Sequence, residues 1–309
     1  MTQNKPPAWI ITGPTAGIGR RTALALAAHG TVVLVGRNAS KLAEVQQEIA
    51  AAGGTATTVV ADMSDLVSVQ KAAAEIVALD LNLAGLLNNA GIFPLEAATS
   101  PQGWDLTYAT DHLGPFVLTE ALLSHLPDGA HVAFVVSAVE DPDRKPAVMS
   151  GFRGSRYISA EASARGEWES GGASRPGIDA YATSKQGNLA TVLAFARETP
   201  RIRFSALEPG FSPGSDLGRD AGAVLTFVSK YVLSPLAPMI KYWSTPKRAA
   251  RVITRILVDA SVPTGGYYDE NGKPMRGSSQ VSDPGFQDRV VRETRVLLTT
   301  QGFAQEVAS

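Results

Sequence analysis

Near its start the chain reads Thr12-Gly13-Pro14-Thr15-Ala16-Gly17-Ile18-Gly19, between an apolar run at Trp9–Thr12 and a helical pattern at Gly17–His29. The three glycines carry no side chain that would keep the backbone away from a bound pyrophosphate. The amino end of the helix supplies amide donors and the positive end of a dipole. A strand, a glycine-rich turn and a helix in this order indicate a dinucleotide site, with the spacing G-x-x-x-G-x-G in place of the usual G-x-G-x-x-G.

The segments that follow alternate between strand patterns and helix patterns. We expect further strands at Thr31–Val35, Ala56–Ala61, Leu83–Leu87, His131–Val136 and Arg203–Leu207, and further helices at Lys41–Ala52, Ser68–Leu79, Asp105–Leu126 and Tyr181–Arg197. Continuous apolar strands separated by helices are typical of a parallel sheet covered on both faces. The sequence therefore predicts a single α/β domain over residues 1–309, a doubly wound Rossmann-type fold with a parallel seven-stranded sheet.

Two segments interrupt the alternation. Residues 138–178 are rich in glycine and charge and stand where a short connection would suffice, so we interpret them as an insertion that is either functional or disordered. Phe211–Thr245 is apolar and is interpreted either as a core helix or as a lid, at about 211–245, over a substrate cleft.

Composition excludes several classes of function. The 309 residues carry a net charge of -1, which gives no electrostatic reason to expect nucleic acid or an anionic membrane as a partner. Cysteine is absent, so disulfides, thiolate metal sites and cysteine nucleophiles are excluded. The four histidines show no metal-ligand spacing, and we predict no metal site; His112 is expected to be structural. No signal peptide is visible and the longest apolar stretch is too short to span a bilayer, so we expect a cytoplasmic protein with no membrane span.

The end of the second strand bears on the choice of cofactor. It reads Val35-Gly36-Arg37-Asn38, and an arginine there suits the 2′-phosphate of NADP(H), whereas an acidic residue would bind the free ribose of NAD(H). The sequence therefore favours NADP(H), the alternative being that Arg37 is merely solvated. Asp62 and Met63 close the third strand at the sheet edge where an adenine would lie, with Asp62 available as an acceptor.

A helical pentapeptide, Tyr181-Ala182-Thr183-Ser184-Lys185, carries the candidate chemistry. Residues four apart share one face of a helix, so the Tyr181 hydroxyl and the Lys185 ammonium can point into the same space. A phenol ordinarily has a pKa near ~10. A nearby cation is expected to lower the pKa of Tyr181 and make it a usable proton donor or acceptor.

Taken together, these motifs resemble the short-chain dehydrogenase/reductase family. Besides the glycine turn and the Tyr181/Lys185 pair, the matching positions are Asp62, Asn88-Asn89-Ala90-Gly91, Ser137 and Pro209-Gly210, in the family's order and over nearly the whole chain. Two further stretches, Tyr108–Gly114 and Ser184–Leu189, are similar to the branch that holds retinol dehydrogenases and protochlorophyllide reductases. The lack of cysteine argues against reduction of protochlorophyllide by light.

The resemblance implies a role for each matching position. Ser137 would hydrogen-bond the substrate carbonyl oxygen, Tyr181 would donate a proton to it, and Lys185 would bind the nicotinamide ribose and lower the pKa of Tyr181. The cofactor-binding positions would be Gly13, Thr15, Ala16, Gly17, Ile18, Gly19, Arg37, Asp62, Met63, Asn89, Ala90, Gly91, Tyr181, Lys185, Pro209, Gly210, Ser212 and Ser215.

The chain departs from the family pattern at three places. The fourth catalytic position is usually Asn and here is Asp111, which would act through its backbone carbonyl. The Thr that usually follows Pro-Gly is replaced by Ser215, with Ser212 as a competing choice. The 138–178 insertion separates Ser137 from Tyr181; in some carbonyl reductases such an insertion masks the usual dimer surface, so we expect a monomer or a homodimer.

These inferences predict an NADPH-dependent carbonyl reductase, reversible in direction, acting on a bulky hydrophobic ketone or aldehyde such as a retinoid, steroid or polyketide. The alternative is a catalytically inactive NADP-binding sensor, although such proteins typically lose the tyrosine or the lysine.

Overall fold

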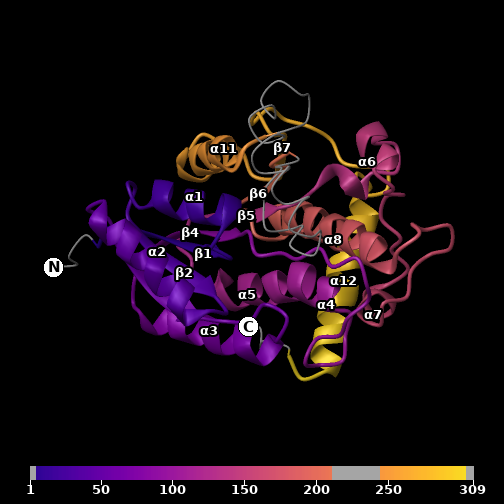
Figure 1. Ribbon diagram of the computed structural model, residues 1–309, viewed down its shortest axis with the longest axis horizontal. Helices are drawn as coiled ribbons and strands as arrows, with labels where there is room; N and C mark the ends of the chain where they lie inside the picture. The colour runs from indigo at the N-terminus through magenta and orange to yellow at the C-terminus, as the bar shows by residue number, and fades with distance from the viewer. Residues whose placement is uncertain (1–4, 211–243, 304–309) are drawn as a thin grey trace, which may run out of the picture.

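The computed structural model describes residues 5–210 and 244–303 and is organised around a seven-stranded, all-parallel sheet (Figure 1). The strands are β1 (Pro7–Thr12), β2 (Thr31–Gly36), β3 (Thr55–Val60), β4 (Asn82–Asn88), β5 (His131–Val135), β6 (Arg203–Leu207) and β7 (Gly266–Tyr268), in the order β3-β2-β1-β4-β5-β6-β7. The order reverses direction between β1 and β4, and in such sheets ligands bind outside the carboxyl ends of the strands at this point. The predicted fold class is confirmed.

Helices cover both faces of the sheet. They are α1 (Gly17–Leu26), α2 (Ala39–Ala51), α3 (Leu66–Ala78), α4 (Leu106–Tyr108), α5 (Gly114–Leu123), α6 (Lys145–Met149), α7 (Ala160–Ala164), α8 (Pro176–Glu198), α11 (Pro246–Val258) and α12 (Pro284–Thr300), with the π-helical turn η1 (Ala109–Leu113) and the 3-10 turn η2 (Ala138–Glu140). Figure 1 shows α1 and α11 on one side of the sheet and α3 and α5 on the other.

The two faces enclose two separate hydrophobic cores. Alternate residues of β1 point to opposite faces, so Ile10 packs with α3, α5 and α8, whereas Ile11 packs with α1, α2 and α11. On the first face a second layer is added, because α12 lies against α8 and α7 (Figure 1). Helix α8 is consequently buried on the sheet side and on the α12 side, which fixes the orientation of the side chains that it carries.

Several helices differ from the sequence predictions in their bounds or their continuity. The strand predicted at Arg203–Leu207 has these bounds, but α8 begins at Pro176, five residues before the expected Tyr181. The helix predicted at Asp105–Leu126 is divided into α4, the π-helical η1 and α5. The 138–178 insertion contains η2, α6 and α7, while β7, α11 and α12 were not located from the sequence.

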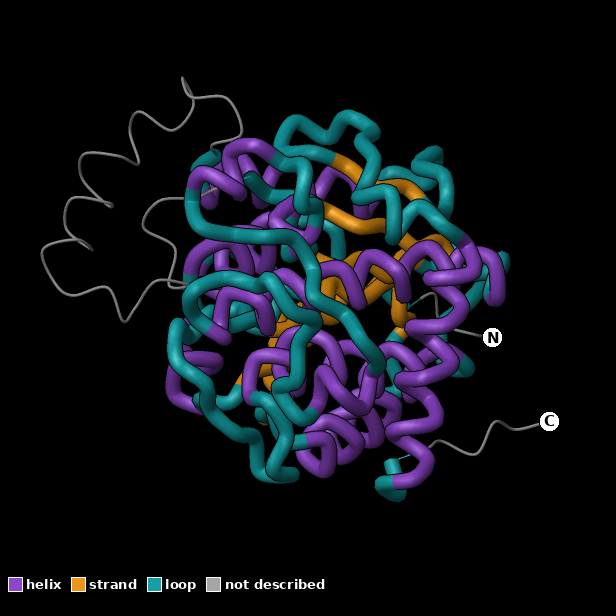
Figure 2. Tube along the Cα trace, turned by 90° about the vertical axis from the view of Figure 1, so that its right-hand side faces the viewer, coloured by secondary structure: helices purple, strands orange, loops and turns teal. Residues whose placement is uncertain are grey.

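Several predicted features fall on residues that the structure does not describe. The candidate lid lies outside the described residues except for Ser244 and Thr245, and Ser212 and Ser215 lie outside them too. Within residues 5–210 and 244–303, no helix combines the length and apolar character needed to cross a membrane. The tube view in Figure 2 shows the described chain as helices and loops wrapped around the central strands.

Candidate active site

The glycine-rich turn lies at the carboxyl end of β1, where the strand order reverses. Gly13 and Gly17 have φ angles of 67° and 52°, in the left-handed region that favours glycine. A Cβ atom on Gly19 would lie 2.2 Å from the Gly13 carbonyl oxygen, so a side chain there would break the turn. The N-cap of α1 is Ala16, which gives no side-chain hydrogen bond to the first-turn amides. The turn therefore leaves helix amides available to an anion, and these residues fit a dinucleotide pyrophosphate.

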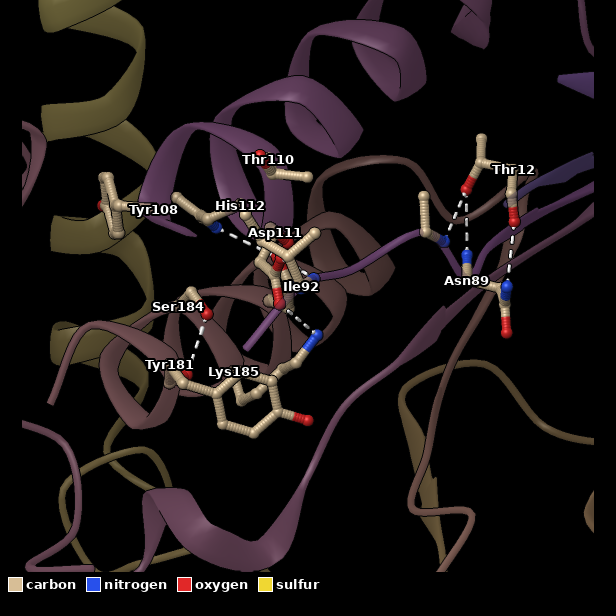
Figure 3. Close-up of polar contacts among 12 residues, drawn as sticks. Thr12, Asn89, Ile92, Tyr108, Thr110, Asp111, His112, Tyr181, Ser184 and Lys185 are labelled. Atoms are coloured by element: carbon tan, nitrogen blue, oxygen red, sulfur yellow. Dashed lines mark hydrogen bonds and ion pairs between the residues drawn. The ribbon is translucent and has the colours of Figure 1, made fainter. Parts of the chain in front are cut away.

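A second segment holds the turn in place. Asn89, after β4, donates through Nδ2 to the Thr12 carbonyl at 2.9 Å and to the Gly13 carbonyl at 3.2 Å (Figure 3). The Thr12 hydroxyl accepts from the backbone amides of Asn89 at 3.0 Å and Ala90 at 2.9 Å. These four bonds join the carboxyl ends of β1 and β4, so Asn89 and Ala90 lie beside the turn.

The residues expected around the adenosine also lie at this edge of the sheet. Arg37 is exposed immediately after β2, and the next residue, Asn38, caps α2 by accepting from the Lys41 amide at 2.9 Å. Asp62 is partly buried after β3, where its Oδ1 accepts from the amide of Ser64 at 2.9 Å and from its hydroxyl at 2.7 Å. Met63 is buried at 5% exposure. Arg37 is therefore on the surface, directly after the carboxyl end of β2.

The serine lies near the tyrosine. The side chain of Ser137, the residue before η2, is close enough to the Tyr181 hydroxyl on α8 to lower the pKa of that phenol, and both residues are partly exposed. The segment after β5 is fixed by Glu208, whose carboxylate accepts from the Ala138 amide and, at 3.0 Å, from the Gly210 amide. Glu208 thus ties the residue that follows Ser137 to the Pro209-Gly210 turn. Sequence reasoning missed it, although its position directly before Pro-Gly at the end of β6 was a usable signal.

Lys185 is held by Asp111 (Figure 3). Its Nζ lies 2.9 Å from Asp111 Oδ2, with the two side chains 5% and 0% exposed, and Asp111 Oδ1 accepts from the Ile92 amide at 2.8 Å. The lysine Nζ is 5.1 Å from the centroid of the Tyr181 ring. A Cβ on Gly91 would lie 3.0 Å from Asp111 Oδ2, so glycine leaves room for the ion pair. Burial raises the pKa of Asp111, and the charge of Lys185 opposes that rise.

The backbone carbonyl of Asp111 has a specific partner. Asn188 Nδ2 donates to it at 2.7 Å, while Asn188 Oδ1 lies 3.0 Å from His112 Nδ1. His112 is fully buried, its Nε2 lies 3.3 Å from the Thr294 hydroxyl, and burial lowers its pKa to about 4. His112 is therefore structural, as expected. Asn188 was not assigned a role from the sequence, although it lies three residues after Lys185 on the same helical face.

The expected lowering of the Tyr181 pKa by Lys185 is not found. Burial of the ring raises the pKa of Tyr181, the charges of Asp111 and Glu208 raise it further, and the nearby Ser137 hydroxyl opposes them. The reason is electrostatic: the Lys185 ammonium is compensated by a carboxylate 2.9 Å away, so its effect on the phenol is cancelled. The structure therefore holds Tyr181 as a neutral phenol.

Within the described part of the chain, no group of three or more His, Asp or Glu side chains could hold a metal ion. What the site brings together is a glycine-rich turn, a phenol with an alcohol near it, and a buried ammonium, all at the carboxyl edge of one parallel sheet.

Comparison with known proteins agrees with this arrangement. The family model described as short chain dehydrogenase matches residues 8–146. A short-chain dehydrogenase/reductase of Armillaria gallica is 31% identical over 283 residues, covering 87% of this chain and 85% of the relative. A putative daunorubicin C-13 ketoreductase, DnrU, of a Streptomyces species is 29% identical over 272 residues, covering 87% and 85%. Retinol dehydrogenase 13 of Homo sapiens is 28% identical over 276 residues, covering 84% and 75%.

A solved structure shares the fold. The short chain dehydrogenase from Burkholderia cenocepacia J2315, determined in complex with NADP, superposes with a TM-score of 0.62 at 22% identity, covering 86% of this chain and 95% of that one.

Proposed function

The chain belongs to the short-chain dehydrogenase/reductase family of oxidoreductases, with similarity to its retinol dehydrogenase branch, and we propose that it is an NADPH-dependent carbonyl reductase for bulky hydrophobic ketones or aldehydes. The observation that carries the proposal is the gathering of Ser137, Tyr181 and Lys185 at the carboxyl edge of the sheet, with the Lys185 Nζ 5.1 Å from the centroid of the Tyr181 ring. An alcohol and a neutral phenol on one side of a cofactor site can bind a carbonyl oxygen and protonate it.

The residues of this chain have separable tasks in the reaction. Ser137 binds the carbonyl oxygen and orients it toward Tyr181. Tyr181 donates its proton as negative charge develops on that oxygen, and a positioned proton donor of this kind contributes a factor of ~10²–10⁴ to the rate. NADPH, when bound, supplies the hydride. The Pro209-Gly210 turn, Gly91 and Lys185 are assigned to the nicotinamide side of the cofactor, and the glycine turn to its pyrophosphate.

Two observations support the choice of NADPH and of reduction. Arg37 is exposed at the end of β2, at the position that contacts a 2′-phosphate in dinucleotide folds, and the Burkholderia structure contains NADP. A phenol is protonated at neutral pH and can donate its proton to a ketone, and DnrU is named as a putative ketoreductase.

The experiment that tests the proposal follows NADPH oxidation with a panel of hydrophobic ketones. We expect turnover in the wild type and its near-complete loss in Tyr181→Phe, with the Kd for NADPH, measured by fluorescence titration, changed by less than about threefold. Wild-type binding of NADPH without turnover of any ketone would instead identify a cofactor-binding sensor. Near-normal turnover in Tyr181→Phe would refute the assignment of the proton donor.

A further inference from the structure

The insertion between Ser137 and Tyr181 contributes a side chain to the neighbourhood of the proton donor. Phe152 lies in this insertion, and its ring stacks on that of Phe93, which follows β4, with ring centroids 5.8 Å apart and an interplanar angle of 21°. The two centroids lie 6.4 Å and 4.8 Å from the centroid of the Tyr181 ring. We call these three rings the aromatic wall.

The backbone around Phe152 is anchored to the catalytic helix. Arg156 donates its amide to the hydroxyl of Thr183 at 2.9 Å, and Thr183 is fully buried two residues after Tyr181. Ser155 donates its amide to the Glu140 carbonyl at 2.9 Å, and the Phe152 amide donates to the Ala147 carbonyl at 3.1 Å. The position of Phe152 relative to Tyr181 is therefore set by the fold of the insertion.

Phe93 is fixed from the other side. Its neighbour Ile92 donates its amide to Asp111, and the start of α8 packs so closely on the next residue that a Cβ at Gly177 would lie 1.9 Å from the Pro94 carbonyl oxygen. The two phenylalanines thus reach Tyr181 from separate, anchored loops.

The exposure of these rings distinguishes them from the core aromatics. Phe116, Phe134, Phe195 and Phe204 are each 0% exposed, whereas Phe93, Phe152 and Tyr181 all keep part of their surface open. Partly open rings next to a proton donor offer apolar, flat surface to whatever binds there.

We propose that the 138–178 insertion forms one side of the substrate site and that Phe152, with Phe93, selects ketones whose carbonyl is attached to a flat aromatic ring system. Because Phe93 and Phe152 lie 4.8 Å and 6.4 Å from the Tyr181 ring, a ring bonded to a carbonyl held by Tyr181 would reach them, and aromatic pairs are favourable at centroid separations of ~4.5–7 Å. A saturated ring of the same size is puckered and gains no stacking. This inference rests on the proposed function, because it takes the carbonyl position from Tyr181.

The test compares two probes of nearly equal size, an acetylnaphthalene and the corresponding saturated acetyldecalin. Binding is measured by equilibrium dialysis against protein saturated with NADP+, and kcat/KM is measured separately with NADPH. The variants are Phe152→Leu, Phe93→Leu and Phe152→Tyr, which keeps the ring. The control is Met149→Leu in the same insertion, since Met149 is 88% exposed.

We expect the wild type, Phe152→Tyr and the control to bind the aromatic probe preferentially. Each leucine variant should lower the aromatic-to-saturated ratio about three- to tenfold, the range that a single aromatic pair is worth. An equal ratio in wild type and Phe152→Leu, or no preference in the wild type, overturns the inference. Preferential binding of the aromatic probe without turnover refutes the proposed reduction but supports the role of the aromatic wall. Turnover without preference for the aromatic probe refutes the role of the aromatic wall and leaves the proposed reduction supported.

Discussion

Replacing Asp111 by Asn changes the charge of the site with almost no change in shape. Asn retains an oxygen that can accept the Ile92 amide, but it removes the carboxylate that lies 2.9 Å from Lys185 Nζ. The ammonium is then left buried without its counter-charge. Asp111→Asn also restores the residue usual at this position in the family, so the variant separates the side-chain charge from the backbone role predicted for residue 111.

The size of the effect on stability follows from the geometry. Two unit charges 2.9 Å apart attract by about 6 kcal/mol at an effective dielectric constant of ~20, before the desolvation of both groups is subtracted. Removing one partner of a buried pair typically costs about 3–5 kcal/mol, because the other charge stays desolvated. We therefore expect Asp111→Asn to lower the free energy of unfolding by about 3 kcal/mol, and less in the presence of saturating NADP+.

The same substitution should change the pH profile. The charge of Asp111 raises the pKa of Tyr181, so its removal, together with the uncompensated Lys185, lowers that pKa. The charged groups that face Tyr181 are Asp111, Glu208 and Lys185, and the last two are unchanged in the variant. Reduction needs the protonated phenol. The wild type, whose Tyr181 pKa is raised above ~10, should therefore keep its rate of ketone reduction up to pH ~10, whereas the variant should lose rate at a lower pH. Alcohol oxidation needs the phenolate and should begin at lower pH too.

The assays are thermal or denaturant unfolding at neutral pH and kcat/KM between pH 6 and 10 in both directions. The matched control is Asp105→Asn, at the N-cap of α4, where the side chain accepts from the Tyr108 amide at 2.8 Å and Asn caps a helix as well as Asp does. An unfolding midpoint for Asp111→Asn equal to that of the control, or a profile displaced toward higher pH, would contradict the ion pair and its effect on Tyr181.

Three further outcomes follow from the site and the core. Gly19→Ala should weaken NADPH binding more than about tenfold in a fluorescence titration, because the new Cβ meets the Gly13 carbonyl, whereas Gly285→Ala, with its nearest neighbour at 3.5 Å, should not. Arg37→Asp should lower kcat/KM for NADPH by about 10–100-fold and should lower kcat/KM for NADH less. Arg251→Asp, at an exposed position on α11, should leave kcat/KM for both cofactors unchanged. Burial lowers the pKa of His112 and of His131 to about 4, so their NMR signals should not titrate between pH 8 and 5. In the unfolded state the histidine pKa is near ~6.5, so below that pH the unfolded chain binds a proton at each histidine that the folded protein does not. The free energy of unfolding should therefore fall by about 3 kcal/mol for each histidine as the pH falls from ~6.5 to 4.

The sequence predicted best what depends on local chemistry. The glycine turn needs backbone conformations and close approaches that glycine alone supplies, and Asn89, Ser137 and Tyr181 lie at the ends of strands or on one helix face, so their positions at the sheet edge follow from the alternation of elements. Strands β1 to β6 were predicted for the same reason, because each apolar run is long enough to be recognised without its neighbours. Strand β7, with three residues, was not.

The features that the sequence did not reveal depend on partners distant in the chain. Glu208 fixes the residue after Ser137 across a separation of 70 residues, and the Asp111 carbonyl meets Asn188 across 77. The π-helical turn η1 interrupts a helix whose pattern is continuous in the sequence. Helix α12 packs on the side of α8 that faces away from the sheet, and the sequence of α12 alone does not indicate which helix it contacts.

The Tyr181 pKa shows most clearly why a local motif can give the wrong sign. The pair Tyr181 and Lys185 is visible as an i, i+4 spacing, and by itself it predicts a lowered pKa. The carboxylate that compensates Lys185 comes from η1, and the second charge, Glu208, comes from the end of β6, so neither appears in the motif. At neutral pH the population of phenolate falls tenfold for each unit by which the pKa rises. The rate of alcohol oxidation, which needs the phenolate, should therefore depend on pH through a phenol whose pKa is set by burial of the ring and by two charges outside the pentapeptide.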